Sequence, residues 1–208
     1  MKKLVILLAL APAMLLMSAA FNKKTGIEIG ENAPLTKTKM TNVDGKKYTL
    51  EGLKKEKGLV VVFSCNTCPF VVGSKSFAGW EKDYNSLSEL ANQKDLGFVL
   101  INANEAKRKD EDSLEEMKKR AKEKEYKMPY LVDKKSALAD AFGAKTTPHV
   151  FVFDENMKLI YNGSIDNSWD SKREEDVSYL KNVMTQLSAN QTITTAQTPP
   201  RGCSIKRK

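Results

Sequence analysis

Residues 58–69 read GLVVVFSCNTCP, and this stretch decides the fold. After Gly58 its first half is an unbroken run of β-branched and apolar residues without a polar face, which predicts a strand buried on both sides. Its second half places Cys65 and Cys68 directly where that strand ends, followed by Pro69, a residue tolerated in the first turn of a helix. The sequence therefore predicts a buried strand, then a cysteine pair, then a helix.

Strand and helix patterns alternate on either side of this stretch. Asp44-Gly45 is a turn signal and predicts an N-terminal β-hairpin. Apolar and aromatic residues repeat at threes and fours from the cysteines to Leu90, which predicts one long helix. Later strands and helices, the last of them a hairpin and a helix, are expected at 97–101, 110–126, 128–132, 137–142, 149–161 and 177–187. The predicted fold class is α/β, with a mixed central sheet flanked by helices.

Composition divides the chain of 208 residues into three parts. Residues 1–20 fit a secretory signal peptide, with two lysines, an apolar run and a small-residue cleavage site. The alternative is an uncleaved membrane anchor, because about 20 apolar residues can span a bilayer. Residues 21–188 are expected to form one domain, and residues 189–208 a polar C-terminal tail with a flexible, basic ending and no core of its own. We therefore expect an exported protein, periplasmic or equivalent, that meets a membrane only if the leader is uncleaved.

The net charge is mildly basic. Lysine and arginine number 34 against 26 acidic residues, a formal charge of +8 that falls to +6 without Lys2 and Lys3 of the leader. Acidic and basic residues are intermixed, and no basic stripe is interleaved with aromatic residues. Nucleic-acid binding is therefore not expected.

The cysteine pair predicts thiol chemistry. A helix amino terminus stabilises a thiolate, so we expect Cys65 to be the exposed attacker with a lowered pKa. Cys68, about one helical turn further on, is expected to be the shielded thiol that resolves a mixed disulfide. Half a zinc site is disfavoured because only His149 and Cys203 remain as further ligands, and a structural disulfide across so small a loop stabilises little. The prediction is a thiol–disulfide oxidoreductase that acts on protein thiols and disulfides and needs no metal or organic cofactor.

A resemblance to a known family rests on three separate stretches. Residues 65–70, CNTCPF, with Thr147-Pro148 some eighty residues later, resemble the thioredoxin-like superfamily. Residues 33–50 and 151–163 are similar to its redoxin branch, which includes alkyl hydroperoxide reductase and thiol-specific antioxidant proteins. Residues 202–206, GCSIK, look like the tail of a peroxiredoxin-like bacterial subgroup.

The resemblance implies a role for Thr147 and Pro148. It implies that the bond between them is cis and that the Thr147 backbone pairs with an extended substrate near Cys65. A loop of this kind leaves a free edge for strand-like docking. Leu59 stands where thioredoxins have a buried aspartate that assists proton transfer. Val62 stands three residues before Cys65, where a peroxidatic cysteine needs threonine or serine, so thiol peroxidase is an alternative with less support.

Two further residues are accessory candidates. His149 either completes a copper site with the two sulfurs, as in a metallochaperone-like redoxin, or is a strand-edge histidine without a role in the site. Cys203 either folds back as a third redox thiol or anchors the tail by packing. The sequence leaves both questions open.

Overall fold

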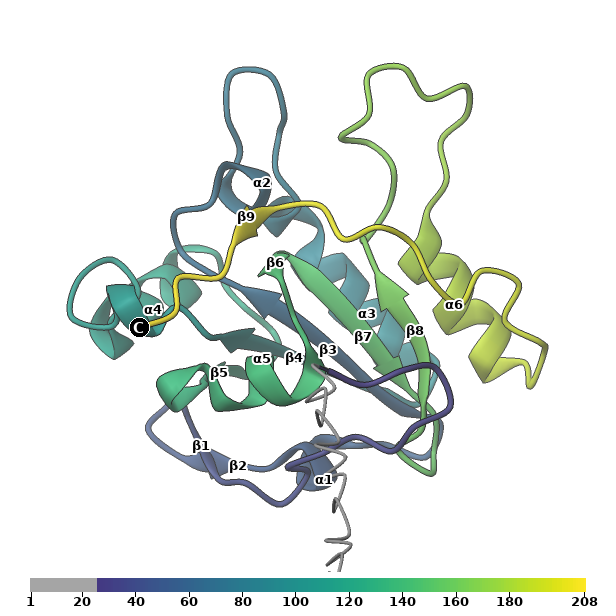
Figure 1. The fold of residues 1–208 in the computed structure, drawn as a ribbon, viewed down its shortest axis with the longest axis horizontal. Coiled ribbons are helices and arrows are strands. Elements are labelled where there is room, and N and C mark those ends of the chain that lie inside the picture. Colours follow the sequence, from purple (N-terminus) through teal and green to yellow (C-terminus); the bar gives the residue numbers. More distant parts are fainter. Residues whose placement is uncertain (1–25) are drawn as a thin grey trace, which may run out of the picture.

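Residues 26–208 are described by the computed structural model, so the expected leader at 1–20 lies outside the described residues. Their strands form a seven-stranded central sheet in the order β2-β1-β5-β4-β3-β7-β8 (Figure 1). These strands are β1 (Met40–Asn42), β2 (Lys47–Tyr48), β3 (Gly58–Ser64), β4 (Leu96–Asn102), β5 (Tyr130–Val132), β7 (His149–Phe153) and β8 (Leu159–Gly163). Strands β3, β4 and β5 are parallel, and the remaining pairs are antiparallel. The predicted mixed sheet is confirmed.

Helices cover both faces of this sheet. They are α1 (Leu50–Leu53), α2 (Pro69–Val72), α3 (Tyr84–Gln93), α4 (Leu114–Glu123), α5 (Ala137–Phe142) and α6 (Tyr179–Ser188). Side chains alternate across β3: Val60 and Val62 belong to the core on the side of α3, α4 and α6, whereas Val61 and Phe63 belong to the core on the side of α5. Full burial of such a side chain contributes roughly 1.5–3 kcal/mol, so β3 is the strand on which both cores depend.

The prediction of one long helix after the cysteines is wrong. Helix α2 ends at Gly73, whose φ is +97°, and a loop follows before a short 3-10 turn and α3. The loop folds back so closely that a Cβ on Gly79 would lie 2.3 Å from the Gly73 nitrogen. The aromatic residues Phe70, Phe77 and Trp80 pack against one another in this region. The spacing of Phe77 and Trp80 therefore reflects this aromatic cluster, and only the later positions of the pattern lie on a helix, α3.

The remaining expected elements are present with shifted ends. The hairpin signal at Asp44-Gly45 corresponds to β1 and β2, and the later hairpin to β7 and β8. The charged helix begins at Leu114, not at 110, because the Ser113 side chain accepts a hydrogen bond from the Glu116 N–H and caps it there. Between residues 26 and 208, no helix is both long and apolar enough to cross a membrane.

The C-terminal tail lies against the domain, which corrects the expectation of a flexible ending. From α6 it crosses the molecule to form β9 (Cys203–Ser204), which pairs with β6 (Thr146–Thr147), as the yellow segment of Figure 1 shows. Ile205 is 5% exposed and packs into the core on the side of α5. Apolar residues of the tail thus belong to the cores of the domain.

Candidate functional site

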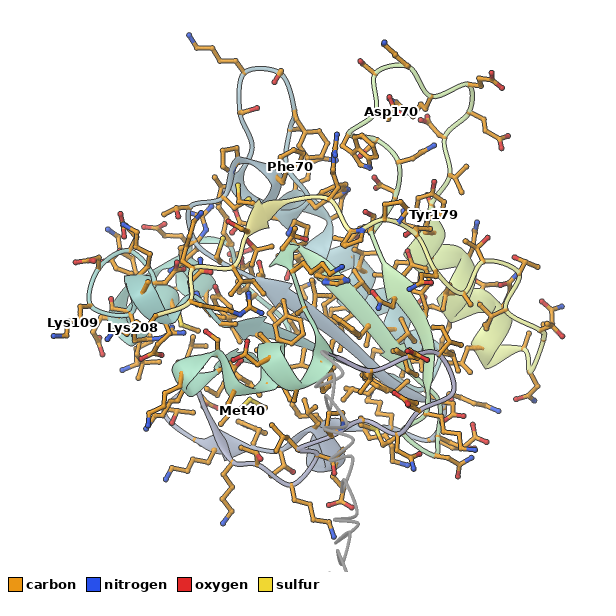
Figure 2. All side chains as sticks on the ribbon, in the orientation of Figure 1. Met40, Phe70, Lys109, Asp170, Tyr179 and Lys208 are labelled. Carbon is orange, nitrogen blue, oxygen red and sulfur yellow. The ribbon has the colours of Figure 1, made fainter. Side chains whose placement is uncertain are left out.

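The two cysteines lie at the junction of β3 and α2. Strand β3 ends at Ser64, and Cys68 is the residue that precedes α2, with Pro69 at the first helical position. The structure leaves only 2% of Cys65 and 4% of Cys68 exposed. The expectation that Cys65 is exposed and Cys68 shielded is therefore wrong in this conformation, in which neighbouring segments cover both sulfurs. Phe70, which follows the cysteine pair in α2, is labelled at this end of the molecule in Figure 2.

The Thr147-Pro148 loop lies directly against the cysteine pair. The peptide bond between Thr147 and Pro148 is cis. The hydroxyl of Thr147 is 3.1 Å from the Cys65 sulfur, and the Cys68 sulfur lies 3.0 Å from the carbonyl oxygen of Thr147, which accepts a hydrogen bond from Cys68 only when that thiol is protonated. The fold thus brings together the four residues that the sequence singled out from segments some eighty positions apart.

The two cysteines have pKa values that are shifted in opposite directions. The hydrogen bond from Cys65, assisted by the Cys203 side chain and by the backbone N–H groups of Cys203 and Phe70, lowers the pKa of Cys68 to about 5. The same hydrogen bond to Cys68, together with burial, raises the pKa of Cys65 well above its usual range. The predicted lowering of the Cys65 pKa is therefore wrong here: the hydrogen bonds around the pair favour the thiolate on Cys68.

A buried carboxylate, which the sequence does not indicate, lies beside the cysteine pair. Asp112 is fully buried and accepts hydrogen bonds from the Asn66 backbone N–H (2.9 Å) and from the side-chain amides of Asn102 (2.7 Å) and Asn104 (2.9 Å). Its negative charge also contributes to the raised pKa of Cys65. Asp112 follows Asp110 and Glu111 in a charged stretch, so nothing in the sequence distinguished it from an exposed acid.

The amide of Asn66 ties the cysteine loop to this network. Its nitrogen donates to the Glu111 carbonyl at 2.8 Å, and its oxygen accepts from the Tyr130 hydroxyl at 3.1 Å. Asn66, one of the two residues between the cysteines, is thus held through its backbone, its amide nitrogen and its amide oxygen. This support fixes the backbone of the cysteine loop before any partner arrives.

His149 does not join the sulfurs. Its Nδ1 accepts a hydrogen bond from the Lys145 N–H at 3.1 Å, and its Nε2 lies 2.6 Å from the Asn162 side-chain oxygen. The ring is therefore the neutral tautomer with the proton on Nε2, and burial lowers its pKa to about 4. Both nitrogens are occupied, which disfavours the copper alternative. Among residues 26–208, no three His, Cys, Asp or Glu side chains are grouped as metal ligands.

Cys203 is the third sulfur at this site. In the pairing of β6 with β9 it lies opposite Thr147, and its backbone N–H is 3.3 Å from the Cys68 sulfur. Burial and a hydrogen bond with Cys68 raise the pKa of Cys203 to about 11. The edge of the Thr147-Pro148 loop, expected to be free for a substrate, is occupied by the tail of this same chain.

The fold and this arrangement of cysteines and cis-proline define a thioredoxin-like protein. The Redoxin family model matches residues 28–183, and the chain belongs to that family. The expected redoxin branch is therefore confirmed, and the family indicates oxidoreductase activity.

Similar solved structures agree with this assignment. An uncharacterized conserved protein from Geobacillus kaustophilus is 34% identical, with a TM-score of 0.77 over 88% of this chain and 95% of that one. Peroxidoxin BcpB from Mycobacterium tuberculosis is 16% identical, with a TM-score of 0.56 over 79% and 97%. A putative protein disulfide isomerase from Bacteroides thetaiotaomicron is 19% identical, with a TM-score of 0.52 over 81% and 92%. The last two show the fold alone. Comparison with curated proteins finds no match.

Proposed function

We propose that this protein is an exported thiol–disulfide oxidoreductase that exchanges disulfides with protein partners through Cys65 and Cys68. The observation that carries the proposal is the hydrogen-bonded pair of sulfurs with a single thiolate, placed against the Thr147-Pro148 loop. A thiolate is the reactive form of cysteine, and a second thiol beside it allows the mixed disulfide to be resolved within the molecule.

The charge distribution makes Cys68 the first nucleophile. Its thiolate attacks one sulfur of a partner disulfide, and the other partner sulfur leaves with the electron pair and takes up a proton. Cys65 then loses its proton and attacks the Cys68 sulfur, which releases the second partner sulfur as a thiol. Two electrons pass from the pair to the partner, and a Cys65–Cys68 disulfide remains. This order reverses the roles expected from the sequence.

A groove beside the pair offers a surface for the partner. It has a volume of about 440 Å³, and the rings of Phe70, Phe77 and Trp169 line it next to Pro69. Apolar rings close to a reactive sulfur suit a partner segment that carries apolar side chains around its cysteine. We expect binding here to be weakened by Phe77→Ala, which leaves the sulfurs unchanged.

Trapping of mixed disulfides tests both the function and the order of attack. Cys65→Ser and Cys68→Ser are compared in a Cys203→Ser background, so that no third thiol resolves the trapped species. We expect Cys65→Ser to retain partners through Cys68, and Cys68→Ser to retain few. If Cys68→Ser traps more partner than Cys65→Ser, Cys65 is the first nucleophile and Cys68 the resolving thiol, as the sequence predicts. The function itself is rejected if neither variant traps a partner and the unaltered protein does not catalyse the reduction of insulin by dithiothreitol.

Thiol peroxidase is the second candidate, because a thiolate at the start of a helix also serves peroxide reduction. The residue three positions before Cys68 is Cys65, so the hydroxyl that a peroxidatic cysteine needs at this position is again absent from the sequence. Hydrogen peroxide consumption by the reduced protein, with Cys68→Ser as control, measures this activity. We expect it to be slower than disulfide exchange.

Export is proposed from the leader at residues 1–20 alone. Removal of these residues is expected to retain the protein in the cytoplasm, and cell fractionation of the full-length and shortened chains measures the difference. Equal distribution of the two chains contradicts export.

A further inference from the structure

Cys68 is the central member of a three-sulfur cluster. Hydrogen bonds reach its sulfur from the Cys65 side chain and from the side chain and backbone of Cys203. The cluster is assembled from the end of β3 and from β9, which are 135 residues apart at Cys68 and Cys203. The Cys65–Cys68 chemistry requires only two of these thiols, so the third has no part in the exchange described above.

The position of Cys203 is fixed by close packing and hydrogen bonds of the residues on both sides of it. Gly202 lies so close to the loop that a Cβ there would be 2.2 Å from the Thr147 carbonyl oxygen. On the other side of Cys203, the Ile205 N–H donates to the Lys145 carbonyl at 3.1 Å, and the Ile205 side chain is buried.

The strand is anchored at both ends. Beyond Ile205, the Lys206 N–H donates to the Asn104 side chain at 2.9 Å. Before Gly202, the Arg201 guanidinium lies 4.1 Å from the centre of the Trp169 ring. Contacts on both sides of Cys203 thus hold its sulfur beside Cys68.

We propose that Cys203 is a third redox thiol of this site and that Cys68 exchanges its disulfide between Cys65 and Cys203. This inference rests on the proposed dithiol function. In the exchange, the Cys203 thiolate attacks Cys68 of the Cys65–Cys68 disulfide. The bond between Cys68 and Cys203 forms as the bond between Cys65 and Cys68 breaks, and Cys65 leaves with the electron pair and takes up the proton that Cys203 lost. One disulfide is exchanged for another, so no external oxidant is needed.

Two physical reasons favour this exchange. The paired strands keep the attacking sulfur in contact with its target, which gives an intramolecular reaction a high effective concentration. In the reduced site the Cys68 sulfur contacts both neighbours, so a disulfide to either one requires no large movement of the chain. The tail therefore both occupies the edge where a partner strand would dock and carries a sulfur that competes with the partner for Cys68.

Peptide mapping of the full-length protein measures the proposed disulfide directly. Lys57 and Lys75 bound one tryptic peptide that contains both Cys65 and Cys68, and Arg201 and Lys206 bound another that contains Cys203. The protein is equilibrated in glutathione redox buffer, quenched with acid, alkylated and digested. A disulfide within the first peptide reports Cys65–Cys68, and a link between the two peptides reports Cys203.

Variants show which cysteine is linked to Cys203 and whether the link requires the docked strand β9. We expect Cys65→Ser to convert the protein almost completely to the linked form and Cys68→Ser to give at least tenfold less of it. Gly202→Ala keeps all three cysteines but displaces β9, and we expect at least tenfold less linked peptide with the Cys65–Cys68 disulfide unchanged. Thr195→Ala, an exposed position of the same tail, is the matched control and is expected to behave like the unaltered protein.

The outcomes separate this inference from the function on which it rests. If the Cys65–Cys68 disulfide forms and Cys65→Ser gives no more linked peptide than Cys68→Ser, the third thiol is rejected and the dithiol function stands. Equal linkage in Gly202→Ala and in the unaltered protein rejects the docked strand as its cause. If neither disulfide forms at any potential, both proposals fail.

Discussion

Three residues around the pair influence which sulfur carries the charge. The buried carboxylate of Asp112 opposes a negative charge on Cys65, and the N–H groups of Cys203 and Phe70 favour one on Cys68. This division is an electrostatic property of single residues around a common pair. Leu59 of β3 stands where thioredoxins have a buried aspartate. In this protein, the buried acid near the cysteines is Asp112, from the segment before α4.

The lowered pKa of Cys68 predicts an unusual pH profile. Because the pKa is about 5, Cys68 is already a thiolate at neutral pH, and its rate of alkylation by iodoacetamide should change little between about pH 7 and 9. The rate should fall as the pH falls through about 5. An ordinary thiol, with a pKa of about 8.5, gains steeply over the higher range. Mass spectrometry of the alkylated peptide measures the rate at each cysteine, and a midpoint for Cys68 above about 8 contradicts the assignment.

Replacement of Asp112 should shift the titration of Cys65. Asp112→Asn removes the negative charge, so the pKa of Cys65 should fall, as followed by thiolate absorbance in a Cys68→Ser, Cys203→Ser background. In either orientation the new amide turns its N–H₂ group toward at least one of the donors on Asn66, Asn102 and Asn104, which should cost about 1–3 kcal/mol of unfolding free energy. Asp110→Asn, at an exposed neighbouring position, is the control. An unchanged Cys65 titration counts against the role of the carboxylate.

At the scale of elements, helix ends position the site. Helix α2 is a single turn that starts directly after Cys68, and α4 starts at Leu114, two residues after Asp112. The start of α4 is fixed by Ser113, whose side chain accepts from the Glu116 N–H at 3.3 Å. Asp112 lies just before this cap, where its carboxylate accepts hydrogen bonds from Asn66, Asn102 and Asn104.

Loss of this cap should weaken the protein. Ser113→Ala removes the acceptor for an N–H of the first turn and should lower the unfolding free energy by about 1 kcal/mol. Urea denaturation of the reduced protein measures the change. Lys119→Ala, exposed within the same helix, should change stability by no more than about 0.5 kcal/mol. An equal effect of the two substitutions excludes the cap as the cause.

At the scale of the whole molecule, the tail closes the site. Residues far apart in the chain meet there: β3 brings the cysteines, β6 the proline loop and β9 the third sulfur. Ile205 connects this edge to the core on the side of α5. Access to Cys68 is therefore set by how firmly the tail is docked, and not by the cysteine motif alone.

Release of the tail should expose the sulfurs. Ile205→Ala removes a buried side chain at a cost of up to about 2–5 kcal/mol, limited by the free energy with which the tail docks. We expect faster alkylation of both Cys203 and Cys68 and a small decrease in Tm. Ser204→Ala, exposed on the same strand, should leave both rates unchanged. If Ile205→Ala lowers Tm without faster alkylation, the residue stabilises the domain and does not control access.

Some of this protein is determined by its sequence alone. Unbroken apolar runs predict β3 and β4, and the spacing of the motif places Cys65 and Cys68 at the end of β3. These features depend on neighbouring residues, because the backbone repeats of strands and helices convert local sequence into faces and ends.

The tertiary structure decided the rest. The proton shared by Cys65 and Cys68, the burial of Asp112 and the docking of Cys203 beside β6 each depend on contacts between distant segments, up to 135 positions apart. A hydrogen bond or the loss of solvent around a charge depends on what the fold places within a few ångströms, which no local pattern encodes. The local motif therefore identifies the reactive thiols. Contacts from distant segments of the chain determine which thiol is charged and which residues cover them.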